Sequence, residues 1–509
     1  MYDDSERLLH DADALDDDVR SRLDKTIDRI GMGRYQWTLL CLCGCGWLAD
    51  NMWLQAAAIV LPRVQQHYSV PDNWIGAASA AMFAGMLLGA VGWGTCSDLL
   101  GRSTAFNATL VFTALFGLLA SLSWSFTSLA VILFLLGTAV GGSMPTDGTL
   151  IIEHLPQPKL YLVTALSIFF SVGSVVAAVF ALFLVPQNSC AVATIPCDPA
   201  LNNGWKHYLG ALGIFTLAMF IARVVFFRLH ESPRFLVHAG RPAEALVALQ
   251  AMARFNGNPQ LADELDLPDV DDSVATVVED DASYMPIGNG DTKSGSRWLR
   301  RLQMVLEPEW RRTSLLIWGA WCGMALAYTM FNVYLPKLLE SKGTTSIEAS
   351  LWDVLIFTIG GCPGAFVGAK LILTPLGRRW SLAGSTIMTA VFCLLFVFAQ
   401  KAQNAFFVRI SATGVGLAST VMWSILYGWT PEIFATKVRG TACGMASGFS
   451  RIGGVLAPIL GGMLLLISRA APVYTSMVVF LFAAACVLML SENEGESGRT
   501  QGGRPVVVH

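Results

Sequence analysis

The chain has 509 residues, of which 54% are hydrophobic and only 14% are charged, and its mean hydropathy is +0.54. Soluble domains carry about 25% charged residues, so this composition excludes an ordinary soluble protein and indicates a chain that lies in a bilayer. The formal net charge is −3, and we expect no nucleic-acid partner.

Apolar blocks recur along the chain, separated by short polar joints that hold most of the charge. A helix needs about 20 apolar residues to cross a ~30 Å hydrocarbon core. The blocks are continuous and do not alternate, so the backbone is expected to be helical in lipid. We predict twelve spans at 36–61, 74–97, 104–123, 127–151, 160–186, 207–229, 311–336, 350–373, 379–400, 404–428, 440–467 and 471–490.

The polar segments divide the chain into five parts. An acidic N-terminal tail at 1–35 precedes a six-helix bundle at 36–229, and a central loop at 230–310 leads to a second bundle at 311–490 and a tail at 491–509. Lys and Arg concentrate beside one set of alternating joints, which the positive-inside rule places in the cytosol. Both termini and the central loop are therefore predicted to be cytoplasmic, and 1–35 has no apolar core of a signal peptide.

Most of the eleven cysteines lie in or against predicted spans, where they act as small hydrophobic residues. Cys190 and Cys197 lie in the loop after the fifth span, predicted to be outside, and the sequence leaves open whether they form a disulfide. The run "CLCGCG" spreads its thiols around a helix, with no His or acid at ligand spacing. We expect no metal and no cofactor.

The two halves repeat a loop pattern. "GWGTCSDLLGRSTAF" at 92–106 follows the second span, and "GAKLILTPLGRRWSL" at 368–382 follows the eighth in the same frame. A looser pair, "DGTLIIEHLPQPK" and "YGWTPEIFATKVRG", follows the fourth and tenth spans. These repeats predict an all-α membrane protein with twelve transmembrane helices in two six-helix repeats around a central cavity.

These motifs resemble a known group of proteins. G-x-x-x-D-x-x-G-R at 94–102, "ESPRFL" at 231–236 and "PEIFATKVRG" at 431–440 resemble the loops of the major facilitator superfamily, near its sugar-porter and organic-solute branches. "IGMGRYQW", "GGSMPTDGTLIIEHLP", "EPEWRRTSLLIW" and "RGTACGMASGFSRIGGVLAP" further resemble the synaptic-vesicle-protein-related branch and its fungal relatives. The resemblance implies a secondary transporter of a small organic solute that works by alternating access, not an enzyme.

Some positions depart from the sugar-porter pattern. Thr374 replaces the acid in the second loop copy, Phe134 stands where a span-four arginine is common, and span seven lacks paired glutamines. A sugar is therefore not our first expectation for the substrate.

Charged residues at the inner ends of the spans are candidates for a cytoplasmic gate, which the resemblance implies closes in one state and opens in the other. A plain topological excess of bases is the alternative, but acids contribute little to topology. The candidates are Asp98, Arg102, Glu153, Glu231, Arg234, Arg378, Arg379, Glu432 and Arg439. We also place Asp147, near the inner end of span four, with this gate.

Asp50 and Arg451 are predicted to lie near mid-bilayer. At 1.5 Å per residue, Asp50 is ~20 Å beyond Trp37 and Arg451 is ~16 Å beyond Gly440. Each charge costs about 2.5–3.5 kcal/mol there, so each needs a wet cavity or a partner. Our hypothesis makes Asp50 the proton-coupling site and Arg451 the site for an anionic substrate group, and a permanent structural ion pair is the alternative. Asn51, Asn332 and Tyr328 are expected to contribute to the same cavity.

We predict a proton-coupled symporter of an organic anion such as a monocarboxylate, with protons as the second partner. A sugar or polyol transporter is the alternative, followed by a non-transporting nutrient sensor. The chain has no Walker A loop, H-E-x-x-H or G-x-S-x-G motif, which disfavours an enzyme. We expect a functional monomer in the plasma membrane or, because "DSERLL" at 4–9 has the form of a sorting signal, in a vacuolar or endosomal membrane.

Overall fold

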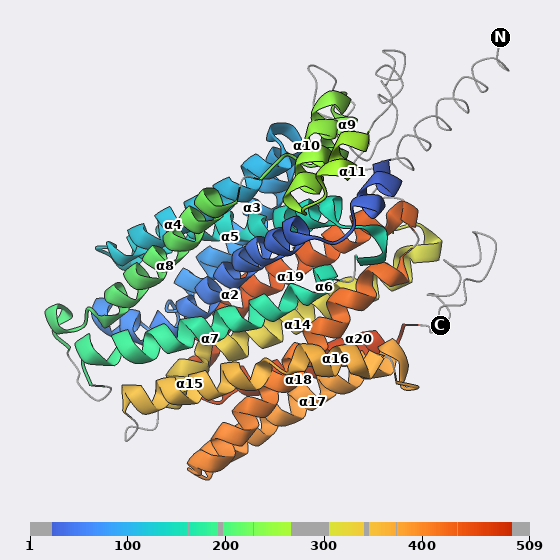
Figure 1. Ribbon diagram of the computed structural model, residues 1–509. Coiled ribbons are helices and arrows are strands. Elements are labelled where there is room, and N and C mark those ends of the chain that lie inside the picture. Colours follow the sequence, from blue (N-terminus) through green and yellow to red (C-terminus); the bar gives the residue numbers. More distant parts are fainter. Residues whose placement is uncertain are drawn as a thin grey trace, which may run out of the picture.

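Two helical bundles lie side by side in Figure 1, the first drawn in blue to green and the second in yellow to red. This computed structural model describes residues 23–159, 162–191, 197–227, 229–265, 305–340, 346–372, 374–434 and 436–490. The predicted sorting signal at 4–9 lies outside these residues, as does the C-terminal tail. Among the described residues, twelve long transmembrane segments are present, six in each bundle. The predicted all-α architecture is confirmed.

The first bundle, which we call the N half, comprises six long helices and one short one. They are α2 (Arg34–Tyr68), α3 (Ala77–Leu100), α4 (Arg102–Ser121), α5 (Phe126–His154), α6 (Leu162–Ala165), α7 (Ser167–Leu184) and α8 (Gly204–Phe226). Local chemistry sets several of their ends. Ser125 accepts a hydrogen bond from the backbone N–H of Ser128 and so caps α5. Gly101, at φ +100°, makes the sharp break between α3 and α4.

The second bundle, the C half, has the same number of transmembrane segments. It contains α14 (Pro308–Glu340), α15 (Ile347–Gly361), α16 (Gly364–Ile372), α17 (Gly377–Lys401), α18 (Ala405–Ile433), α19 (Thr436–Leu465) and α20 (Ala471–Leu488). The eighth span, predicted as one helix over 350–373, is divided into α15 and α16. Pro363 lies at the division, and its missing N–H cannot continue the helical hydrogen-bond ladder.

Three short helices of the central segment cover one end of the N half. They are α9 (Pro233–His238), α10 (Pro242–Phe255) and α11 (Pro259–Glu264), and Figure 1 shows them gathered at that end. The Asn256 side chain accepts a hydrogen bond from the backbone N–H of Tyr35 at 2.8 Å and so ties α10 to the start of α2. We call this the inner end of the molecule and the opposite end the outer end.

Apolar length makes this chain an integral, multi-pass membrane protein. Among the described residues, eleven helices are long and apolar enough to cross a bilayer. The remaining long helix, α2, is not in that set; it carries Asp50 and Asn51 in its middle and Arg63 near its end. These polar side chains interrupt the apolar run of α2 and require a partner or a cavity within the protein.

Small residues allow helices to approach closely. In α5, a Cβ atom on Gly137 or Gly141 would collide with the backbone carbonyl of Met82 or Met86 in α3. The halves meet through α2 with α14, α3 with α19, and α7 with α15. These three contacts frame the space between the halves.

Gly137→Ala is expected to lower stability, because the added methyl group meets backbone atoms that cannot move aside. Overpacking of this kind costs about 1–3 kcal/mol. Gly148→Ala on the same helix is the control, since its Cβ would enter open space and alanine favours a helix by up to about 1 kcal/mol. Thermal unfolding in detergent should show the first variant melting below wild type and the second at or above it; equal melting temperatures would contradict the packing argument.

Candidate functional site

A cavity of about 490 Å³ lies between the two halves. Helices α2, α3, α5, α6 and α7 line it from the N half, and α14, α15, α16, α18 and α19 line it from the C half. The lining includes all five residues predicted for the substrate and proton site, namely Asp50, Asn51, Tyr328, Asn332 and Arg451. The tertiary structure therefore brings these residues from three helices around one space.

Asp50 faces the cavity from α2 but is only 2% exposed. The hydroxyl of Ser143 in α5 lies 2.5 Å from each of its carboxylate oxygens. A hydroxyl can donate to an ionised carboxylate or accept from a protonated one, so Ser143 suits both forms of Asp50. Ser143 was not recognised from the sequence, although it lies four residues before Asp147 on the same helix face.

Asn51 has a structural task beside the cavity. Its amide nitrogen donates to the carbonyl of Phe170 at 2.6 Å and to the hydroxyl of Ser174 at 2.5 Å, both from α7. The donor group of Asn51 is therefore occupied, and its contact with α7 fixes the helix that carries Asp50.

Arg451 is held at the cavity by one contact in each half. Its Nη1 donates to Ser447 one turn earlier in α19 at 2.9 Å, and its Nη2 donates to the carbonyl of Gly141 in α5 at 3.3 Å. That carbonyl is available because Pro145, four residues later, has no N–H to offer it. Among the described side chains, no carboxylate lies within ion-pair distance of Arg451, so the permanent pair with Asp50 is not present in this conformation.

Aromatic side chains form the C-half wall of the cavity. Tyr328, Trp423 and Tyr427 all line it, and the rings of Trp423 and Tyr427 lie 5.8 Å apart between centroids. Asn332 is 9% exposed, and its side-chain oxygen has no hydrogen-bond partner among the described residues. The wall thus offers flat apolar surface, one unused acceptor and one cation.

A buried pair of opposite charges lies inside the N half, and our prediction that its acid, Asp147, belongs to the inner gate is wrong. Asp147 is fully buried among α2, α5 and α8, with Arg223 Nη2 at 3.9 Å, and it does not belong to the inner-end cluster around Glu153. Arg223 was not predicted as a partner of Asp147. The shared signal was available in the sequence, because both charges lie inside apolar runs.

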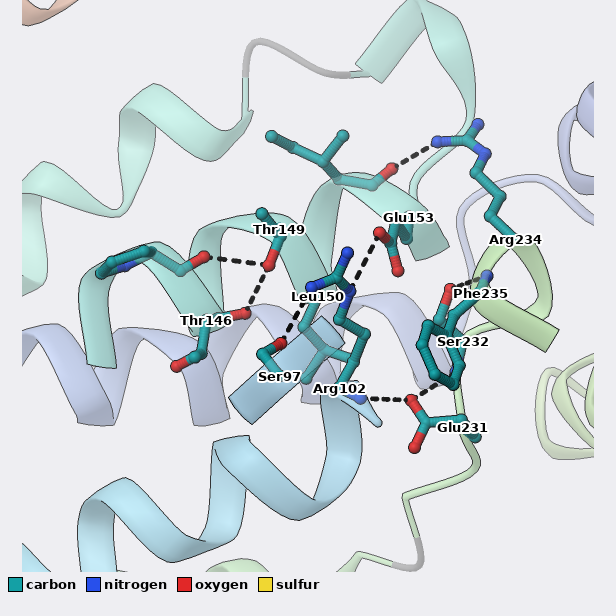
Figure 2. A network of polar contacts seen from close by, with 12 residues as sticks. Ser97, Arg102, Thr146, Thr149, Leu150, Glu153, Glu231, Ser232, Arg234 and Phe235 are labelled. Atoms are coloured by element: carbon teal, nitrogen blue, oxygen red, sulfur yellow. Dashed lines mark hydrogen bonds and ion pairs between the residues drawn. The ribbon is translucent and has the colours of Figure 1, made fainter. Parts of the chain in front are cut away.

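At the inner end of the N half, Arg102 organises a polar cluster that Figure 2 shows. Its Nη1 donates to Ser97 at 2.9 Å, and its Nε lies 3.3 Å from Glu153 Oε1. Glu231 accepts from the backbone N–H of Arg102 at 2.8 Å and so caps α4 with a negative charge. Arg234 donates to the carbonyl of Ile152 and pairs with Asp24.

The described residues of the C half include a counterpart of this cluster. Arg378 pairs with Glu432 at 2.8 Å, and Arg379 donates to the carbonyl of Leu488. The side chains of the two other predicted gate residues, Asp98 and Arg439, lie outside the described part of the structure.

The outer end is closed by ion pairs that join the halves. Arg63 of α2 pairs with Glu340 of α14, and Asp72, just after α2, pairs with Lys337 of α14 at 2.5 Å. Among the described side chains, every ion pair that joins the two halves lies at this end. The sequence predicted no outer gate, because the partners Arg63 and Glu340 lie 277 positions apart and no local pattern connects them.

A disulfide joins Cys190 to Cys197 in the loop between α7 and α8. The carbonyl of Cys190 accepts a hydrogen bond from Arg63 Nη1 at 2.9 Å. Cys190, one member of the disulfide, therefore contacts the outer closure directly.

Fold and site together define the class: two six-helix halves, a cavity between them and cross-half ion pairs at one end are the construction of a secondary transporter of small organic solutes. The chain matches the family described as "Sugar (and other) transporter" over residues 48–491 and belongs to this family of the major facilitator superfamily. The resemblance seen in the sequence is confirmed.

Several known proteins resemble the chain over most of its length. It is 33% identical to MFS siderochrome iron transporter 1 of Ceriporiopsis subvermispora, covering 91% of this chain and 88% of that protein. It is 24% identical to the synaptic vesicle 2-related protein of Bos taurus (95% and 84% covered) and 26% identical to the niacin transporter NiaP of Acinetobacter baylyi (93% and 97%). The fold matches a partially occluded inward open structure of the xylose transporter XylE from E. coli, with TM-score 0.64, 14% identity and coverage of 89% and 96%.

Glu340→Gln is expected to open the outer end, because it leaves Arg63 buried without its anionic partner. Breaking a buried pair by removing one member costs about 3–5 kcal/mol. Two spin labels placed on opposite halves at the outer end should report a longer distance in a larger fraction of molecules. Glu348→Gln is the control, since Glu348 is exposed at the same end. An unchanged distance in Glu340→Gln would show that the pair does not hold the closure.

The contact between Asp72 and Lys337 should survive mild acidification. Burial alone would raise the pKa of Asp72, but hydrogen bonds from Lys337 and Gln65 outweigh it and hold the pKa below its ordinary value. A lowered folded pKa means that the contribution is complete above the ordinary carboxyl pKa of about 3.9 and is lost as the pH falls through the lowered value.

Titration of Asp72 should therefore not change the distance between the two spin labels between pH 7 and about 4. In Lys337→Gln the pKa of Asp72 should be higher than in wild type, because the hydrogen bond and the charge of Lys337 are lost while burial remains, so loosening that comes from protonation of Asp72 should begin at a higher pH. Identical pH profiles for wild type and Lys337→Gln would contradict this account.

Proposed function

We propose that the protein is a proton-coupled symporter that carries a small organic anion, such as a monocarboxylate, by alternating access. One observation carries the proposal: an acid and a base, Asp50 and Arg451, face the same cavity from opposite halves and are not paired with each other. An acid that is well hydrogen-bonded in either protonation state suits a proton. A guanidinium held only by a hydroxyl and a carbonyl is available to a carboxylate.

Electrostatics favours binding both ligands together. Ionised Asp50 and an anionic substrate in one cavity would repel each other, whereas a proton on Asp50 removes that repulsion. Arg451 can then exchange its contact with the Gly141 carbonyl for a bidentate contact with the substrate, which is stronger because both partners are charged. The proton therefore favours substrate binding, and by linkage the substrate favours proton binding.

The two ends supply the alternation in this proposal. The pairs Arg63–Glu340 and Asp72–Lys337 hold the outer end shut here, and the clusters around Arg102 and Arg378 are the proposed gate at the inner end. We take the inner end to be cytoplasmic, with both termini there, and the protein to act as a monomer in the plasma membrane or in a vacuolar or endosomal membrane.

The aromatic side chains of the cavity wall favour a planar substrate in this proposal. Tyr328, Trp423 and Tyr427 offer ring faces near the cation, and aromatic surfaces stack well against flat groups. One relative is named as a niacin transporter, and niacin is an aromatic monocarboxylate.

A sugar or polyol is the alternative substrate. The unpaired side-chain oxygen of Asn332 and the hydroxyls of Thr329, Ser447 and Ser450 at the cavity would suit a polyhydroxyl compound. A nutrient sensor that binds a solute without moving it would use the same cavity and is a further alternative.

Uptake into proteoliposomes tests the proposal. Labelled carboxylates, sugars and organic cations are offered with and without an inward proton gradient. We expect a carboxylate to accumulate only with the gradient, Asp50→Asn to abolish accumulation, and Arg451→Gln to raise the substrate concentration needed for half-maximal uptake. Asp263→Asn, at an exposed position on α11, is the matched control. Sugar uptake that changes neither with the proton gradient nor in Asp50→Asn would favour the sugar or polyol alternative.

A further inference from the structure

We propose that Asp147 is a second proton-binding site, outside the substrate cavity, which takes the proton from Asp50 on its way to the inner end. This inference rests on the proposed proton coupling and extends it to a route through the N half. It assigns a role to a buried pair, Asp147 and Arg223, that lies inside the N half and does not line the cavity.

Asp147 lies one helical turn from Asp50 on the side of the inner end. Ser143, which bonds Asp50, precedes Asp147 by four residues on α5, and Gly46, which packs on Asp147, precedes Asp50 by four residues on α2. Helices α2 and α5 run in opposite directions, so both spacings point the same way. Four residues advance a helix by ~6 Å, which separates the two carboxylates by about one turn.

The surroundings of Asp147 are built for a group that changes charge. It is fully buried, and neither carboxylate oxygen has a hydrogen-bond partner among the described residues. Arg223 is near enough to stabilise an ionised carboxylate, at 3.9 Å, but is not hydrogen-bonded to it. A Cβ on Gly46 would collide with Asp147 Oδ2, so the glycine makes the room that the carboxylate occupies.

Arg223 does not depend on Asp147 for its position. Its two terminal nitrogens donate to the carbonyls of Phe106 at 2.5 Å and Leu42 at 2.7 Å, and its guanidinium lies 3.4 Å from the centroid of the Phe106 ring. A cation fixed by other groups keeps its place whether Asp147 is charged or neutral. A purely structural pair would be expected to contain direct hydrogen bonds.

The other titratable groups around Asp147 come from α2. Among the described side chains, Cys43, Cys45 and Asp50 of α2 and Arg223 of α8 act on it electrostatically. Arg451 of α19 acts on Asp50, and Tyr427 of α18 acts on Arg451. Arg223 acts on both acids, whereas Arg451 acts on Asp50.

The proton step moves the negative charge from Asp147, which lies beside Arg223, to Asp50, which shares the cavity with Arg451. The O–H bond of Asp50 breaks and an O–H bond forms on Asp147, with no change in the total charge. Before the step Asp147 is ionised beside Arg223, Asp50 is neutral, and Arg451 is available to the substrate anion. After it Asp50 is ionised and competes with that anion for Arg451. The transfer therefore drives substrate release toward the inner end.

A pH titration of the substrate-free protein by difference infrared spectroscopy tests the site, with the proton itself as the ligand. We expect wild type to show a buried carboxyl band that disappears in Asp147→Asn and remains in Asp50→Asn. If Asp147→Asn titrates as wild type does, the proposal is overturned. This result does not depend on knowing the substrate.

Transport then separates coupling from binding. With the carboxylate that accumulates in wild type, Asp147→Asn should lower the ratio of inside to outside concentration to one while counterflow exchange stays measurable. If Asp50→Asn loses accumulation but Asp147→Asn keeps it, the relay is wrong and the proposed symport stands. If Asp147 titrates but no solute shows proton-driven uptake, the symport is wrong and the proton site stands.

A charge-neutral double variant guards against misfolding. Asp147→Asn leaves Arg223 uncompensated, whereas Asp147→Asn with Arg223→Gln removes both charges and keeps similar volumes. Accumulation that persists in the folded double variant would identify the pair as structural and overturn the proposal. Loss of accumulation with retained exchange would support it.

Discussion

The cost of an uncompensated charge in a hydrocarbon interior controls this structure. Backbone groups satisfy one another within helices, so the apolar length of each span is enough to specify it. Charged side chains have no such internal solution and require a cavity or a partner on another helix. Among the described residues, charges far from the ends of the spans, such as Asp50, Asp147 and Arg451, consequently mark places where helices must meet in a defined way.

The same cost explains why the ends of the molecule differ. At the outer end, Arg63–Glu340 and Asp72–Lys337 each take one member from either half, so the two halves cannot separate there without exposing or stranding charge. At the inner end, Arg102–Glu153 and Arg378–Glu432 are satisfied within their own halves. Among the described side chains, the ion pairs that join the halves in this conformation therefore lie at the outer end, while the inner-end pairs stabilise each half by itself.

An irregularity in one helix connects the halves at the cavity. Pro145 removes a backbone donor from α5, and the freed carbonyl of Gly141 is bonded by Arg451 from α19. The Gly141 carbonyl, which has no helical donor, thus positions Arg451 of the opposite half. The bond is a neutral-acceptor contact of 3.3 Å, which a charged ligand can replace. Arg451 therefore has a hydrogen-bond acceptor when no substrate is bound and can exchange it for a charged substrate group.

The amino-acid sequence by itself determined the twelve spans, the two halves and the family, and it predicted that Asp50 and Arg451 lie near the middle of their spans at a cavity. These follow from hydrophobic length, from motif spacing and from the cost of charge in lipid, all of which act along the chain. Only the tertiary structure decided which charges meet. It separated Asp50 from Arg451, gave Asp50 the hydroxyl of Ser143, buried Asp147 with Arg223 away from the inner gate, and joined Arg63 to Glu340 across 277 positions of sequence. Partner choice depends on how helices rotate and pack against one another, and a local pattern of residues does not contain that information.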